Sequence, residues 1–144
     1  MTTEDELAAL TAAFLAAVTF APGERPDYDA IRGLFIDQGV LIRNIGTLDI
    51  TTVDEFIAPR QALVDSGALT EFEELELAHI TEVFGNVAHR MSTYSKSGVQ
   101  DGVRFEARGV ISTQFVFTPS GWRMSAMAWD DERPGLVMPD RYEP

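Results

Sequence analysis

The segment from about Val103 to Asp131 restricts the fold most, because it predicts two long β-strands joined by a turn at residues 118–121. Large apolar residues alternate along both strands, and side chains of a strand point to opposite faces with a period of two. One face of this hairpin is therefore expected to be buried. The predicted buried row contains Ile111, Phe115, Phe117, Trp122, Met124, Ala126 and Ala128.

The companion row of the same hairpin is amphipathic. It carries Arg108, Ser112, Gln114, Arg123, Ser125, Met127 and Trp129. A sheet with one apolar face and one amphipathic face is expected to pack helices on the first and a partner subunit on the second.

Three helices are predicted before residue 70. Thr3 followed by Glu6 is a capping-box pattern, and Thr51 and Thr52 each stand three residues before an acid. Pro59 is expected to kink or restart the third helix, because its ring removes a hydrogen bond. The predicted helices cover about residues 3–21, 27–38 and 52–66, with a short strand at residues 40–42.

The rest of the chain is predicted to be strand, over about residues 70–84, 87–97, 103–117 and 122–130. Helices followed by a long antiparallel sheet indicate an α+β domain with its helices on one face. We expect residues 1–131 to form a single domain. Residues 132–144 contain three prolines and are expected to form an arm on the surface or on a partner.

Charge and composition exclude several classes of protein. The 144 residues carry 23 acidic and 11 basic side chains, a net charge of -12, and Lys96 is the only lysine. Nucleic acid and anionic membranes are therefore not expected as partners. The acidic N-terminus and the lack of a long apolar run predict a cytoplasmic protein.

No metal site is predicted. The chain has no cysteine, and its two histidines, His79 and His89, fall on opposite faces of one predicted hairpin. No cofactor is expected either.

The turn at residues 85–86 sets the register of that hairpin and places Glu82 opposite His89. Two interpretations remain open for this pair. It is either a general acid–base pair, since histidine needs little tuning near neutral pH, or an exposed cross-strand ion pair. Asp130 has the same two alternatives, because it can act as an acid–base in a cavity or meet Arg133 in solvent.

The order of these elements, with Gly121-Trp122-Arg123-Met124 and the close at residues 128–131, resembles the nuclear transport factor 2-like superfamily and within it the SnoaL-like subgroup. The resemblance implies a cystatin-like fold. A cone-shaped, strongly curved antiparallel sheet would pack around the N-terminal helix, with a cavity between them. It also implies a homodimer through the outer sheet face.

Ketosteroid isomerase belongs to the same superfamily, but its catalytic groups do not match this chain. Phe14 stands at the position of the isomerase's oxyanion tyrosine, and Thr113 at that of its protonated aspartate. The base aspartate falls near Arg43 and Asn44. Steroid-type isomerisation is therefore not expected.

The resemblance also implies which residues face the cavity. The candidate catalytic residues are His89 and Asp130. The candidate ligand-binding residues are Phe14, Asn44, Glu82, Met91, Ile111, Thr113, Phe115 and Met124. The outer, dimerising face would carry His79, Arg90, Tyr94, Gln114, Met127 and Trp129. A one-residue bulge in any strand would exchange these two faces.

Three functions remain open from the sequence. The chain could be a cofactor-independent isomerase, dehydratase or cyclase that acts on a small apolar molecule with a His/Asp acid–base. It could instead be a non-catalytic dimeric ligand-binding or accessory protein, or a protein whose outer sheet is its working surface and whose cavity is only core.

Overall fold

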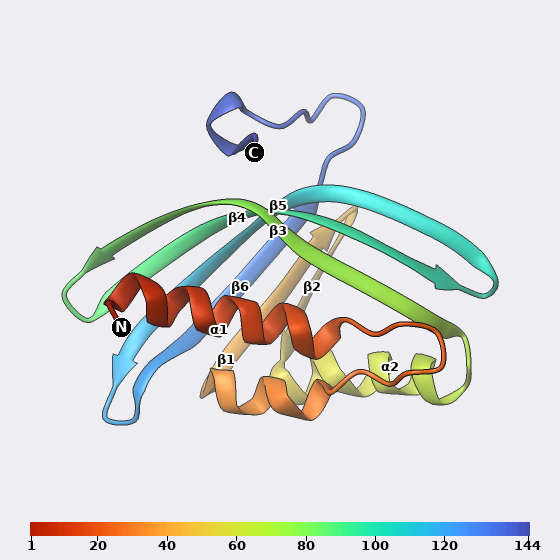
Figure 1. Cartoon of the computed structure of the whole chain (residues 1–144), viewed down its shortest axis with the longest axis horizontal. Helices are drawn as coiled ribbons and strands as arrows, with labels where there is room; N and C mark the ends of the chain where they lie inside the picture. The colour runs from red at the N-terminus through yellow and green to blue at the C-terminus, as the bar shows by residue number, and fades with distance from the viewer.

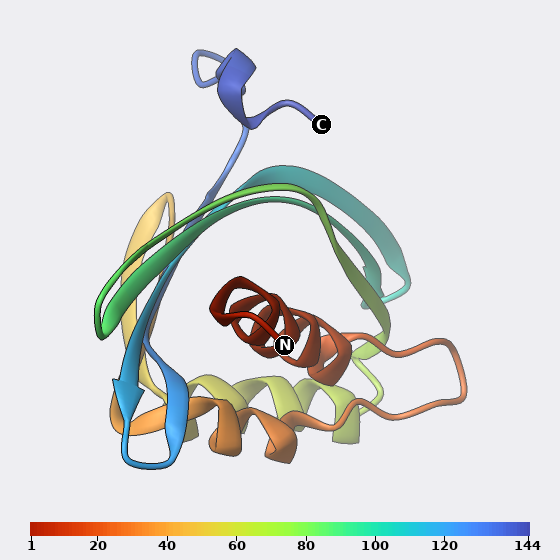
Figure 2. The same cartoon turned by 60° about the vertical axis from the view of Figure 1, so that its left-hand side comes forward.

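Helix α1 (Thr3–Val18) lies inside the arch of a six-stranded sheet in the computed structural model, which describes residues 1–144 (Figures 1 and 2). The sheet has the order β2-β1-β6-β5-β4-β3, and only β1 and β6 pair in parallel. Its strands are β1 (Phe35–Ile45), β2 (Thr47–Thr52), β3 (Leu69–Phe84), β4 (Val87–Gln100), β5 (Val103–Thr118) and β6 (Gly121–Asp131). The predicted α+β architecture with a curved sheet around the first helix is confirmed.

Both α-helices start with a capping box. Thr2 caps α1 together with Asp5, one residue before the predicted Thr3–Glu6 pair, whereas Thr52 and Glu55 cap helix α2 (Val53–Asp65). In each box the threonine hydroxyl accepts from the amide three residues later, at 3.1 Å. Pro59 lies within the continuous helix α2, so the predicted restart does not occur.

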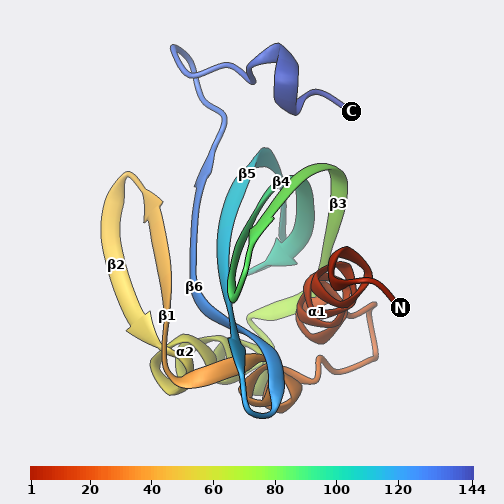
Figure 3. The ribbon, with the colours of Figure 1, turned by 90° about the vertical axis from the view of Figure 1, so that its left-hand side faces the viewer.

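The segment between the helices differs from the prediction. The expected helix at 27–38 is reduced to the 3-10 helix η1 (Tyr28–Leu34), and the short strand at 40–42 is the centre of the longer β1. Strand β2 was not predicted. It pairs with β1 through a turn at Gly46, whose φ of 77° suits glycine, and this hairpin stands over α2 (Figure 3).

Single extra residues interrupt the pairing of two long strands. In β6, Phe115 pairs with Met124 but Gln114 pairs with Ala126, so Ser125 has no partner. In β3, Glu76 pairs with Tyr94 but Ala78 pairs with Thr93, so Leu77 has none. Each bulge moves the residues beyond it to the other face of the sheet.

The main core lies between α1 and the concave face of the sheet. Leu7, Ile31, Leu41, Phe115 and Met124 are completely or almost completely inaccessible to solvent. No helix in the structure is both long enough and apolar enough to span a bilayer.

The segment after β6 returns across the convex face of the sheet (Figure 1). It contains the 3-10 helix η2 (Asp140–Tyr142), and the Thr93 hydroxyl donates to the Tyr142 carbonyl at 2.5 Å. Arg108 pairs with both Glu132 and Glu143, at 2.8 and 2.9 Å. These contacts hold residues 132–144 against β4 and β5.

Candidate functional site

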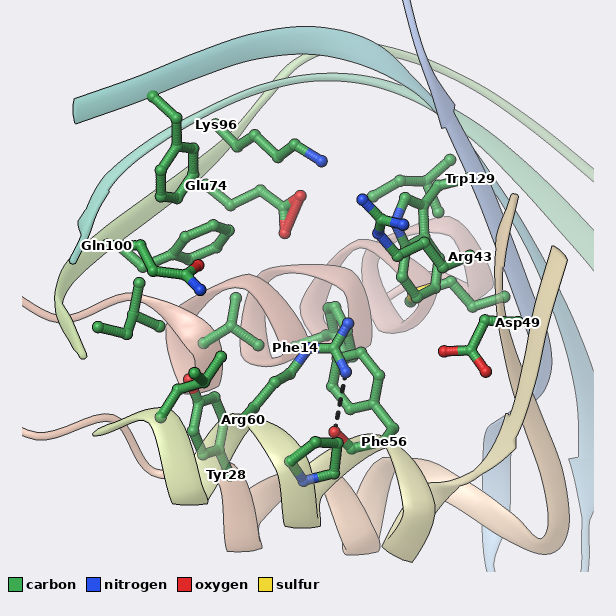
Figure 4. A pocket seen from close by; sticks show the side chains of 18 residues that line it. Phe14, Tyr28, Arg43, Asp49, Phe56, Arg60, Glu74, Lys96, Gln100 and Trp129 are labelled. Atoms are coloured by element: carbon green, nitrogen blue, oxygen red, sulfur yellow. Dashed lines mark hydrogen bonds between the residues drawn. The ribbon is translucent and has the colours of Figure 1, made fainter. Parts of the chain in front are cut away.

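A cavity of about 380 Å³ lies between the two helices and the concave face of the sheet (Figure 4). It has the size of a small-molecule site. Its lining residues are Phe14, Val18, Tyr28, Arg43, Asp49, Phe56, Pro59, Arg60, Leu63, Leu69, Phe72, Glu74, Lys96, Gln100, Phe105, Ile111, Met127 and Trp129.

Aromatic rings form much of the cavity wall. The ring of Phe56 on α2 contacts that of Phe14 on α1, with centroids 6.1 Å apart, and meets Trp129 edge-on, with centroids 6.0 Å apart at 87°. Phe72 and Phe105 form a further pair, with centroids 6.1 Å apart. Such a wall suits a flat, apolar ligand.

Glu74 is the acid best placed for chemistry in this cavity. The bulge at Leu77 turns Glu74 to the concave face, opposite Lys96 on β4, and its backbone amide donates to the Thr19 hydroxyl at 3.2 Å. Burial raises the pKa of Glu74 to about 7, with Asp131 adding to the rise and Lys96 and Arg60 opposing it. The carboxyl can therefore gain or lose a proton near neutral pH.

Asp131, the last residue of β6, holds the Lys96 side chain in place through an ion pair. Its ammonium group lies 3.0 Å from the Asp131 carboxylate, which also accepts a hydrogen bond from the Tyr94 hydroxyl. Burial and that acceptor raise the pKa of Tyr94, so the phenol remains protonated. Gly109 makes room for this arrangement, because a Cβ there would lie 2.4 Å from the Tyr94 hydroxyl oxygen.

Two arginines enter the cavity from other elements. Arg60 on α2 lies over the Phe56 ring, 3.7 Å from its centroid, and donates to the Phe56 carbonyl at 2.9 Å. Arg43 comes from β1, beside Trp129 on β6. Burial lowers the pKa of Arg60, and neither guanidinium has a carboxylate oxygen within 4.0 Å.

Comparison with solved structures identifies the architecture. A nuclear transport factor 2-like superfamily protein from Salmonella enterica Typhimurium superposes with a TM-score of 0.74 at 15% identity, covering 90% of this chain and 91% of that one. The chain has the nuclear transport factor 2-like fold. No protein-family model and no curated protein matches the sequence.

Two further structures with this fold carry functional names. A dehydratase candidate from Streptomyces avermitilis matches with a TM-score of 0.68 at 17% identity, covering 90% of this chain and 95% of that one. An aromatic ring hydroxylase candidate from Novosphingobium aromaticivorans matches with a TM-score of 0.72 at 19% identity, covering 96% and 93%. At these identities the likeness shows the nuclear transport factor 2-like fold alone.

The predicted cavity position of the two candidate catalytic residues is wrong. The His89 imidazole donates from Nε2 to the Glu82 carboxylate at 2.9 Å, as the register predicted, but the two side chains are 52% and 70% exposed on the convex face of the sheet, here called the outer row. Asp130 lies beyond the Ser125 bulge, and Arg133 binds its carboxylate at 2.7 Å, which lowers its pKa. The structure does not bring His89 and Asp130 together.

The eight candidate ligand-binding residues are divided among three places. Phe14 and Ile111 line the cavity. Thr113, Phe115 and Met124 are buried in the core. Asn44 and Glu82 are exposed outside the cavity, and Met91 lies on the outer row. The predicted placement of these three residues on the cavity face is therefore wrong.

Most residues predicted for the outer face lie on the inner one. Met127 and Trp129 line the cavity, because the Ser125 bulge reverses the parity of β6. Tyr94 is fully buried and Arg90 is 3% exposed, with its guanidinium 2.6 Å from Glu76. His79 is exposed but shares their row, opposite Ser92, and only Gln114 lies on the outer row.

Sequence reasoning missed the charged groups of the cavity: Glu74, Lys96, Arg60 and Asp49 were not candidates. In the structure His79 and Thr81 belong to the concave row, so an uninterrupted alternation along β3 would also place Leu77 and Leu75 on the concave face. The bulge puts Glu74 and Glu76 there instead, and no glycine or proline marks it. No group of three or more His, Cys, Asp or Glu side chains is arranged to hold a metal ion.

Proposed function

We propose that the cavity catalyses cofactor-independent proton transfer on a small, flat, mostly apolar molecule, with Glu74 as the general acid–base. The observation that carries this proposal is a carboxyl group in an aromatic cavity with a pKa of about 7. Isomerisation, dehydration and cyclisation can each begin with removal of a proton from carbon. A dehydratase candidate and a ring-hydroxylase candidate among the structural neighbours support chemistry in this fold.

Lys96 completes the proposed chemistry. It lies opposite Glu74 on the neighbouring strand, and both side chains point into the hollow from the sheet side (Figure 4). When Glu74 removes a proton from carbon, the electron pair of that C–H bond moves onto an oxygen of the substrate. The Lys96 ammonium stabilises this developing negative charge, and Asp131 holds the lysine in position.

A generic carbon acid tests the proposal without knowledge of the substrate. In 5-nitrobenzisoxazole a base removes the C–H proton, the N–O bond breaks, and a coloured cyanophenolate leaves. We expect catalysis about 10²-fold above free carboxylate, rising with pH through a midpoint near 7. Glu74→Gln should abolish it and Glu82→Gln, on the outer row, should not. A rate equal in wild type and Glu74→Gln contradicts the proposal.

Ligand binding without chemistry is the second candidate function. It is favoured by one observation: the Lys96 ammonium already has an anionic partner in Asp131. The probe separates the two functions, because a binding protein would bind 5-nitrobenzisoxazole and quench Trp129 fluorescence without releasing phenolate.

The homodimer through the outer sheet face remains a proposal, with corrected residues. The outer row carries Leu75, Ile80, Met91, Ser112 and Ala128, and both Leu75 and Ile80 are more than a third exposed. We expect light scattering to give the mass of a dimer. Ser112→Glu places a charge at an exposed position in the middle of this face and should yield monomers. A monomeric wild type contradicts the assignment.

A further inference from the structure

Arginines in this chain are generally paired with acids. Those at positions 25, 32, 90, 104, 108 and 133 each have a carboxylate oxygen within 4.0 Å. The remaining four, at positions 43, 60, 123 and 141, have none. Two of these four, Arg43 and Arg60, line the same cavity. In a protein of net charge -12, two unpaired cations in one apolar cavity need an explanation.

The positions of these arginines point to a bound anion. Figure 4 shows the guanidinium of Arg60 rising from α2 above Phe56, and that of Arg43 entering beside Trp129. A guanidinium presents a planar fork of N–H donors that matches a carboxylate, and Arg60 uses only one donor on the Phe56 carbonyl. Both groups retain free donors next to the aromatic wall.

The charges of the cavity favour a ligand with a single negative charge. Lys96 is neutralised by Asp131. When Glu74 is protonated, the remaining charged side chains that line the cavity are Arg43, Arg60 and Asp49. These three side chains have a summed charge of +1. One carboxylate neutralises that charge, whereas a phosphate dianion would leave the cavity with a net negative charge.

We infer that Arg43 and Arg60 form a carboxylate-binding subsite, so that the ligand of this cavity is a flat aromatic or similarly apolar acid. The aromatic rings of Phe14, Phe56 and Trp129 pack against the apolar part of the ligand, and the two guanidinium groups bind its carboxylate. The inference rests on the proposed function only in placing the ligand in the same cavity as Glu74.

Paired probes that differ only in charge test this subsite. We expect naphthalene-2-carboxylate to bind about tenfold more tightly than the neutral naphthalene-2-carboxamide by isothermal titration calorimetry. Arg60→Met and Arg43→Met should each reduce that preference to about twofold, whereas Arg60→Lys should keep part of it. Arg123→Met is the matched control, since Arg123 also has no acid partner but lies outside the cavity. Its preference should stay that of the wild type.

Equal affinity of the wild type for the two probes overturns the inference. A carboxylate preference that survives both arginine substitutions overturns it too, and so does a wild type that binds neither probe. The result is separable from that of the proposed function. The carboxylate preference should persist in Glu74→Gln, which abolishes proton transfer. Preference without catalysis of the benzisoxazole reaction contradicts only the proposed function, and catalysis without preference contradicts only the subsite.

Discussion

Trp129 meets the ring of Phe56 edge-on, with centroids 6.0 Å apart, and this contact joins the last strand to helix α2. Trp129→Ala removes the indole from the cavity wall, and we expect a loss of about 2 kcal/mol in the free energy of unfolding because the ring is only partly buried. Urea unfolding measures the loss. Trp129→Phe should lose less, and a neutral Trp129→Ala would contradict the packing.

Glu74 should make stability depend on pH. Its folded-state pKa of about 7 lies above the ordinary value of 4.5, so its contribution is fully present below pH 4.5 and is lost as the pH rises through 7. Glu74→Gln removes this dependence. The variant should match the wild type in acid and exceed its unfolding free energy by roughly 3 kcal/mol above about pH 8. A constant difference across this range would exclude the raised pKa.

Arg90 and Glu76 form an ion pair buried under α1, at 2.6 Å, to which Ser92 and Thr81 add hydrogen bonds. Arg90→Met leaves the carboxylate without its cation, and we expect a loss of about 3–5 kcal/mol in urea unfolding. The double variant Arg90→Met/Glu76→Met should recover part of it. Arg104→Met, which breaks an exposed pair with Glu71, should have little effect.

Thr113 is 1% exposed, and its hydroxyl oxygen has no hydrogen-bond partner. Thr113→Val keeps the shape and removes the unsatisfied hydroxyl, so it should stabilise the protein by about 1 kcal/mol in thermal or urea unfolding. Thr11→Val is the matched control, because the buried Thr11 hydroxyl donates to the Leu7 carbonyl at 3.0 Å. It should bring no such gain.

His89→Gln should leave both the unfolding midpoint and the benzisoxazole rate unchanged. The histidine and its partner Glu82 are exposed on the face opposite the cavity. A loss of rate in this variant, with the protein still folded, would restore His89 as a catalytic residue.

Local patterns in the sequence were sufficient for most of the elements. The capping box at Thr52, the turn at residues 85–86 and the alternation after residue 103 depend on neighbours a few positions apart. The register Glu82–His89 was correct for the same reason, because a two-residue turn fixes the pairing next to it. Strand β2 was missed, since its residues Thr47–Thr52 are mostly exposed and carry no buried alternating row.

The sequence by itself determined the two α-helices, the four long strands after residue 68 and the burial of Phe115 and Met124. The tertiary structure decided which side chains enter the cavity. Ser125 in β6 and Leu77 in β3 are each one extra residue without a partner on the neighbouring strand. Because side chains of a strand alternate between two faces, one extra residue moves every side chain beyond it to the opposite face of the sheet. Trp129 and Glu74 therefore face inward and Asp130 outward, an outcome set by pairing with neighbouring strands and not by the residues themselves.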